Sequence, residues 1–283
     1  MTLILTCLIR DTVIQVSDRR LVYRNGTLAD DFANKVTVYC GHFAFAYAGL
    51  AQLGRPTPDG KPHTDWWLME TLGPKQRRAG EAFAEVAREA AVEVARLGVS
   101  GDIRRKAFVG AGWAKDRETE TYRPLLVAIS NYTDVAGTVV PITEDFRVTV
   151  AQLPKERQFW WTSVGQELTA NEKIETSRLL KRVVKHRKGT AALALVLAST
   201  IRTVASRNVS VGRDLMISIL PIQDIPFAVS VPLGGPPSPN QAQFVYLPAS
   251  PGFQFFAPKV ACNGIMLAGA AVWTGDSPPP WWQ

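Results

Sequence analysis

The sequence predicts an α+β fold, in which runs of strands and runs of helices follow one another along the chain. The first observation is a series of short runs rich in β-branched and apolar residues, at 3–9, 12–17, 35–40 and 43–48. The turns Arg10-Asp11 and Gly41-His42 join these runs in pairs, which is typical of two β-hairpins. The second observation is a pair of consecutive helix-like segments at 171–186 and 190–206, the latter with a clear apolar stripe.

The remaining elements complete a single large domain over residues 1–220. Helices are expected at 65–72 and 81–97, and Gly98 offers a stop for the second. Further strands are expected at 106–114, 125–130, 147–153 and 215–220. Residues 221–283 form a Pro-rich extension that packs on the domain or closes it, with a strand-like run at 244–247, an apolar run at 264–272 and the pair Trp281-Trp282.

Composition indicates an ordinary soluble globular protein. The chain has 283 residues, of which 46% are hydrophobic, enough for one large core. The apolar run at 3–9 is too short for a signal sequence or a membrane span, so a cytoplasmic location and no membrane partner are expected. Three scattered cysteines in apolar runs predict reduced thiols, and neither they nor the three histidines have the spacing of metal ligands. No cofactor is expected.

The net charge of +7 would permit an anionic partner. The main basic cluster, at 181–188, lies at the end of a predicted helix, where cations complement the helix macrodipole. A nucleic-acid partner is therefore not expected, and an interaction surface within a larger assembly is the favoured interpretation of the charge.

Candidate catalytic residues gather in the first 50 positions. Once Met1 is removed, Thr2 holds both a hydroxyl nucleophile and a free α-amine whose pKa lies near ~7.7 to 8, so the amine can act as a general base. Asp18 ends the second predicted strand and Lys35 opens the third. The three residues are expected to meet at one end of a sheet, where Asp18 would hold Lys35 in place and keep it charged.

This segment resembles the proteasome β-subunit family and its bacterial relatives, which are N-terminal nucleophile (Ntn) hydrolases. Asp18 lies sixteen residues after Thr2 and Gly49 fourteen after Lys35, as in that family, with one extra residue between Asp18 and Lys35. The resemblance implies a four-layer αββα sandwich and hydrolysis of amide bonds through an acyl-enzyme on Thr2. It also implies that the backbone N–H of Gly49 stabilises the oxyanion.

Later parts of the chain match the family less closely. A Gly-Ser-Gly-like turn of the family has its best counterpart at 162–166, where Ser163 is displaced by one residue. In an Asp-x-x-Ser-Gly signature, Asn208 replaces the aspartate and Val211 the serine. Asn208 can orient a hydroxyl but brings no negative charge. By resemblance, Leu21, Tyr47 and Ala51 line the pocket for the residue before the scissile bond, and the bulk of Tyr47 favours small or medium apolar side chains.

The family resemblance implies a peptide or protein substrate and a homo-oligomer, with a ring as one form and an unfoldase partner left unspecified. Two alternatives stay open. One is a catalytically weakened or inactive structural or binding subunit, favoured by the displaced Ser163 and by Asn208. The other is an Ntn amidase that cuts small molecules, with the C-terminal extension closing the site against polypeptides.

Overall fold

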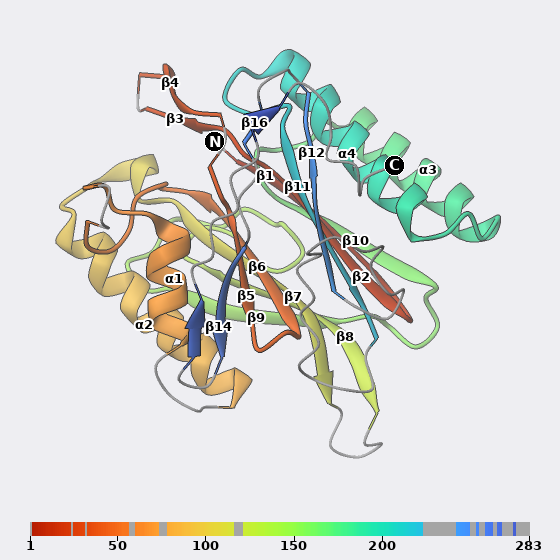
Figure 1. Ribbon diagram of the computed structural model, residues 1–283, viewed down its shortest axis with the longest axis horizontal. Helices are drawn as coiled ribbons and strands as arrows, with labels where there is room; N and C mark the ends of the chain where they lie inside the picture. Colours follow the sequence, from red (N-terminus) through yellow and green to blue (C-terminus); the bar gives the residue numbers. More distant parts are fainter. Residues whose placement is uncertain are drawn as a thin grey trace.

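The computed structural model describes residues 2–23, 25–31, 33–56, 60–73, 78–115, 121–222, 242–249, 253–254, 258–262, 265–267 and 274–275. Met1, the segment 223–241 and Trp281-Trp282 lie outside the described residues, as does most of the run at 264–272. Two sheets carry most of the strands in the described part of the chain (Figure 1).

The first sheet has five antiparallel strands in the order β10-β1-β2-β11-β12. Their bounds are Leu3–Ile9 for β1, Thr12–Asp18 for β2, Phe159–Gly165 for β10, Leu215–Pro221 for β11 and Gln243–Leu247 for β12. The side chains of β1 and β2 are almost completely buried, because one face of this sheet packs on helices and the other on the second sheet.

The second sheet has seven strands in the order β15-β14-β5-β6-β7-β8-β9. Neighbouring strands in this sheet pair antiparallel, except that β14 and β5 pair in parallel. The bounds are Val36–Tyr39 for β5, Phe43–Gly49 for β6, Lys106–Lys115 for β7, Tyr122–Ser130 for β8, Arg147–Gln152 for β9, Lys259–Cys262 for β14 and Ile265–Leu267 for β15.

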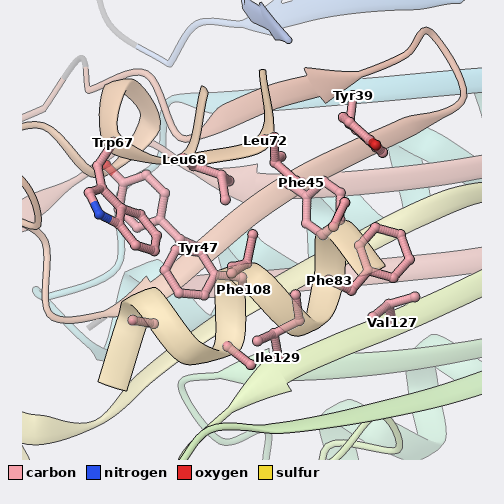
Figure 2. Packing of buried hydrophobic residues seen from close by; sticks show 14 of the residues in the cluster. Tyr39, Phe45, Tyr47, Trp67, Leu68, Leu72, Phe83, Phe108, Val127 and Ile129 are labelled. Carbon is pink, nitrogen blue, oxygen red and sulfur yellow. The ribbon is translucent and has the colours of Figure 1, made fainter. Parts of the chain in front are cut away.

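Two pairs of helices cover the outer faces of these sheets. The helices α1 (Thr64–Leu72) and α2 (Ala79–Arg96) pack on the seven-stranded sheet through an aromatic-rich cluster, part of which is drawn in Figure 2. On the opposite side of the molecule, α3 (Ala170–Lys185) and α4 (Thr190–Arg207) cover the five-stranded sheet through an aliphatic cluster (Figure 1). A third buried cluster fills the space between the two sheets.

Smaller elements connect these layers. The strands β3 (Leu21–Val22) and β4 (Leu28–Asp30) form a short hairpin after β2. A 3-10 helix, η1 (Gly101–Arg104), leads into β7, and β13 (Phe253–Gln254) pairs with β16 (Thr274–Gly275). No helix in the described part of the chain is long and apolar enough to cross a membrane.

Both N-terminal hairpins predicted from sequence are confirmed, and so are the four helices to within two residues at each end. One expectation is wrong: the two hairpins do not share a sheet, because β1 and β2 lie in the five-stranded sheet whereas β5 and β6 lie in the seven-stranded one. The turn expected at 162–166 is also wrong. Residues 162–165 belong to β10, which pairs with the whole length of β1 from Leu3 to Ile9, and Gln166 follows the strand.

Parts of the C-terminal segment are built into both sheets. β12 adds to the edge of the five-stranded sheet beside β11, and β14 lies beside β5. Through β12, the ring of Tyr246 lies 4.7 Å from the guanidinium carbon of Arg19, a buried residue that follows β2 directly. The division of the chain at residue 221 stays a prediction.

The contact between Gly110 of β7 and Phe45 of β6 allows a test of core packing. A Cβ atom at Gly110 would lie 2.4 Å from Cε1 of the fully buried Phe45. Gly110→Ala is therefore expected to lower the free energy of unfolding by about 1–3 kcal/mol. Phe45→Leu removes the clashing ring, so the same change should cost less in that background. Urea unfolding of the double-mutant cycle measures this coupling, and additive energies would contradict it.

Candidate active site

Three side chains from separate parts of the sequence meet at the end of the molecule where β1 begins. Lys35 Nζ donates hydrogen bonds to Oγ1 of Thr2 at 2.8 Å and to Oδ2 of Asp18 at 3.1 Å. Asp18 and Lys35 are 0% exposed and Thr2 is 3% exposed. The predicted trio is thus brought together, although Lys35 arrives from the seven-stranded sheet and the other two from the five-stranded sheet.

The hydrogen-bond geometry of Lys35 matches an ammonium group. Its third acceptor is the backbone carbonyl of Arg20, at 2.6 Å. An ammonium has three N–H donors, and here each faces one acceptor. Burial lowers the pKa of Lys35, and the negative charge of Asp18 acts in the opposite direction. The Asp18 carboxylate therefore favours the protonated form of Lys35 that burial disfavours.

Backbone N–H groups fix the Asp18 carboxylate from three directions. Oδ1 accepts from the N–H of Leu3 at 2.9 Å, and Oδ2 accepts from those of Arg20 at 3.2 Å and Gly212 at 3.3 Å. The donor Gly212 comes from the loop after α4. These bonds leave the carboxylate little freedom to move, so it can orient Lys35 toward Thr2.

The start of β1 is anchored through the backbone of Thr2. Its carbonyl accepts from the N–H of Gln166 at 2.8 Å. A Cβ atom at Gly165 would lie 1.9 Å from the same carbonyl oxygen, so only glycine allows this close approach. The side chain of Asn208 donates to Oε1 of Gln166 at 2.8 Å, and its own Oδ1 accepts from the hydroxyl of Ser210 at 2.7 Å.

Two predicted site residues are not brought into the trio by direct contact. Ser163 lies within β10 opposite Leu5, two positions along β1 from the Leu3–Gly165 pair. Asn208 reaches the nucleophile only through Gln166, whose N–H holds the Thr2 carbonyl. Within the described residues, neither side chain hydrogen-bonds to those of Thr2, Asp18 or Lys35. The loop after α4 thus contributes to the site through the backbone of Gly212, a role that the sequence pattern did not reveal.

Gly49 ends β6 in a conformation that requires glycine. Its φ is +86°, and a Cβ atom would lie 2.0 Å from the carbonyl oxygen of Arg105. By the family resemblance, Gly49 is the residue whose backbone N–H stabilises the oxyanion, a place where the backbone must come close. The structure gives a second reason, because the neighbouring strand already leaves no room for a side chain.

The three residues predicted to line a substrate pocket lie in β6, directly after β6, and in β3. Tyr47 is buried in β6, and its hydroxyl donates to the carbonyl of Asn34, directly before Lys35, at 3.4 Å. Ala51 is half-buried, and its carbonyl accepts from the hydroxyl of Thr64 at 2.6 Å. Leu21 is half-buried in β3, beyond Asp18. Figure 2 shows the ring of Tyr47 packed among the aromatic side chains beneath α1.

A second buried lysine escaped the sequence analysis. Lys106 opens β7, is 0% exposed, and places Nζ 4.1 Å from the centre of the Tyr47 ring. Burial lowers its pKa well below 10.5, and the nearby charge of Lys35 acts in the same direction. A lysine at the start of an apolar strand usually points to solvent, so no local pattern distinguishes this one.

The described residues contain no cluster of three or more histidine, cysteine, aspartate or glutamate side chains suited to a metal ion. Cys7 is buried and burial raises its pKa to about 12, which leaves it an inert thiol.

No protein-family model matches the chain, and no curated protein matches its sequence. Solved structures resemble its fold. A Gly-1 mutant of Anbu from Hyphomicrobium sp. strain MC1 is 13% identical, with a TM-score of 0.46 over 78% of this chain and 82% of that one. Anbu from Yersinia bercovieri, described as an ancestral β-subunit, is 13% identical, with a TM-score of 0.47 over 78% and 81%.

Eukaryotic HslV from Trypanosoma brucei is 14% identical, with a TM-score of 0.39 over 78% of this chain and 99% of that one. These identities and scores are low. The function of this chain must therefore be inferred from the geometry of its own site.

The buried ion pair leads to a stability prediction. Asp18→Asn leaves the Lys35 ammonium without its counter-charge and is expected to lower the free energy of unfolding by about 3–5 kcal/mol. Lys35→Met should cost less, because the three backbone N–H groups still hold the carboxylate. Urea denaturation measures both values.

The exposed pair Arg178–Glu175, 2.6 Å apart, provides a matched control. Glu175→Gln should change the free energy of unfolding by less than about 1 kcal/mol. A cost for Asp18→Asn as small as that of the control would show that the buried pair does not support the fold.

Proposed function

We propose that this chain is a threonine-type Ntn hydrolase that cleaves amide bonds through an acyl-enzyme on Thr2 after removal of Met1. The observation that carries the proposal is the 2.8 Å hydrogen bond from the buried Lys35 ammonium to the hydroxyl oxygen of Thr2. Such a donor stabilises negative charge on that oxygen, which is the charge that develops when the hydroxyl becomes a nucleophile.

In the acylation step, the free α-amine of Thr2 accepts the hydroxyl proton, directly or through one water. The oxygen attacks the carbonyl carbon of the substrate, and the N–H of Gly49 stabilises the resulting oxyanion. The protonated amine then gives its proton to the departing amine nitrogen, and the C–N bond breaks. An ester between Thr2 and the acyl half of the substrate remains.

In the deacylation step, the same α-amine takes a proton from a water molecule, which attacks the ester carbon. The ester C–O bond breaks, the Thr2 oxygen regains a proton, and the acyl half leaves as a carboxylic acid. Lys35 keeps its proton throughout and stabilises the oxygen of Thr2 as nucleophile and as leaving group. Asp18 positions Lys35 and maintains its charge.

The wider proposals follow from the resemblance of the first 50 residues to the proteasome β-subunit family. The two facing sheets and their outer helix pairs are the four-layer αββα sandwich of that family, formed by residues 1–220 and extended by residues 221–283. The protein acts in the cytoplasm as a homo-oligomer, and its substrates are peptides or proteins. Leu21, Tyr47 and Ala51 line the pocket for the residue before the scissile bond.

A second candidate function is a structural subunit without catalysis. The observation that favours it is the position of Ser163 and Asn208, neither of which hydrogen-bonds to the side chains of the trio in the described part of the chain. In that case the Lys35–Asp18 pair would serve only to hold the two sheets together at this end.

Covalent labelling distinguishes the two candidates. Intact-mass measurement of the purified protein should show loss of Met1, which frees the amine of Thr2. A peptide epoxyketone, which reacts with an amine and hydroxyl on one residue, should then add once per chain. Thr2→Ala should abolish the adduct and Lys35→Ala should nearly do so. Retention of Met1, or the same labelling in Thr2→Ala, would refute catalysis by Thr2.

Substrate preference can be measured with a panel of fluorogenic peptides. Because the bulky Tyr47 makes the pocket shallow, small and medium apolar residues before the scissile bond should give values of kcat/KM about tenfold or more above those of large aromatic residues. Charged residues should also be poor. A preference for aromatic or charged residues would exclude this assignment of Tyr47 and leave the catalytic proposal intact.

A further inference from the structure

Lys106 is a buried lysine with no role in the chemistry proposed above. Both of its hydrogen-bond acceptors are uncharged: the backbone carbonyl of Leu50 at 2.5 Å and Oγ1 of Thr64 at 3.2 Å. Taking a lysine out of water is costly, and these two bonds offset part of that cost. What these bonds hold is the chain directly after Gly49.

The contacts of Lys106 reach two consecutive carbonyl groups of that chain. Nζ binds the Leu50 carbonyl itself, and the Thr64 hydroxyl that accepts from Nζ donates to the Ala51 carbonyl at 2.6 Å. Thr64 is the first residue of α1. The lysine therefore ties the 49–51 segment to both β7 and the start of α1.

The same end of β7 also fixes the segment through its backbone. Gly49 pairs with Lys106 in the β6–β7 ladder, and the N–H of Leu50 donates to the carbonyl of Arg105 at 2.9 Å. Both peptide groups of Leu50 are thus held, its N–H by Arg105 and its carbonyl by Lys106. With φ at +86°, Gly49 has a conformation that glycine adopts without strain.

We propose that Lys106 is a positioning residue, which clamps the 49–51 segment so that the Gly49 N–H stays aimed at the oxyanion and Ala51 stays in the pocket wall. This inference rests on the proposed function. Lys106 touches no reacting atom and acts through the carbonyl groups of Leu50 and Ala51.

The protonation of Lys106 is consistent with this role. Its pKa is lowered by burial and by Lys35, whereas Asp65 acts in the opposite direction. A neutral amine has two N–H donors, the same number as the two acceptors it meets here. Lys35, in contrast, has three acceptors, one of them a carboxylate. The two bonds of the clamp can be made by the neutral amine as well as by the ammonium.

Kinetics of three variants test the clamp. Lys106→Met removes Nζ but keeps the apolar stem. Thr64→Val removes the hydroxyl that joins Nζ to the Ala51 carbonyl and leaves the bond from Nζ to Leu50 in place. Because an oxyanion donor acts in the transition state, kcat for a fluorogenic peptide should fall by about 10- to 100-fold in Lys106→Met and by less in Thr64→Val, with KM within about twofold. Thr64→Ser keeps the hydroxyl and should restore the wild-type rate.

Thr71→Val is the matched control, because Thr71 lies on the same helix and its hydroxyl donates to the Trp67 carbonyl at 2.8 Å. It should leave kcat unchanged. An unchanged kcat in both Lys106→Met and Thr64→Val, or a rise in KM alone, would overturn the clamp. If Lys106→Met does not fold, the Thr64→Val and Thr64→Ser pair decides.

Hydrogen exchange at the Leu50 amide separates the clamp from catalysis. Its bond to Arg105 protects this amide in the wild type, and exchange should accelerate about tenfold or more in Lys106→Met. The Thr71→Val protein should match the wild type. If the wild type neither labels nor cleaves peptides, the proposed function fails, whereas unchanged exchange in Lys106→Met refutes the clamp whether or not the protein is active.

Discussion

The structure of the site depends on the burial of one ammonium group. Lys35 is completely removed from solvent, and this is tolerable because each of its three N–H donors meets an acceptor. A buried charge without partners would cost several kcal/mol or lose its proton. The acceptors come from Thr2, Asp18 and Arg20, so the requirement to satisfy this one group fixes the start of β1 and the end of β2 relative to β5.

The two sheets bring these groups together from opposite sides. The Asp18 end of β2 lies in the five-stranded sheet, and Lys35 directly precedes β5 of the seven-stranded sheet. Between the sheets, the inner face of the seven-stranded sheet is lined largely by small residues, among them Ala44, Ala46 and Ala107. Small side chains let the sheets approach closely, which allows a single lysine side chain to span from one sheet to the other.

Two buried lysines lie near the end of β6 and meet different surroundings. Lys35 contacts a carboxylate that three backbone N–H groups hold in place, an environment that favours charge. Lys106 contacts a carbonyl, a hydroxyl and the face of Tyr47, and burial lowers its pKa well below 10.5. The two lysines have identical side chains but different partners. In the proposal, Lys35 therefore supplies a charge next to Thr2, whereas Lys106 holds the backbone beside Gly49.

The sequence by itself predicted the N-terminal hairpins and the four helices, because hydrophobic periodicity is a local property. The grouping of Thr2, Asp18 and Lys35 was predicted on one sheet and supported by the family resemblance, whereas the structure forms it between two sheets. Tertiary structure decided the rest. It separated the hairpins into two sheets, made a strand of 159–165, and recruited the N–H of Gly212 and the amine of Lys106. Gly212 and its partner Asp18 are 194 residues apart in the chain, and Lys106 and its partner Leu50 are 56 residues apart. Such pairings leave no local pattern, since they are set by how the sheets and helices pack.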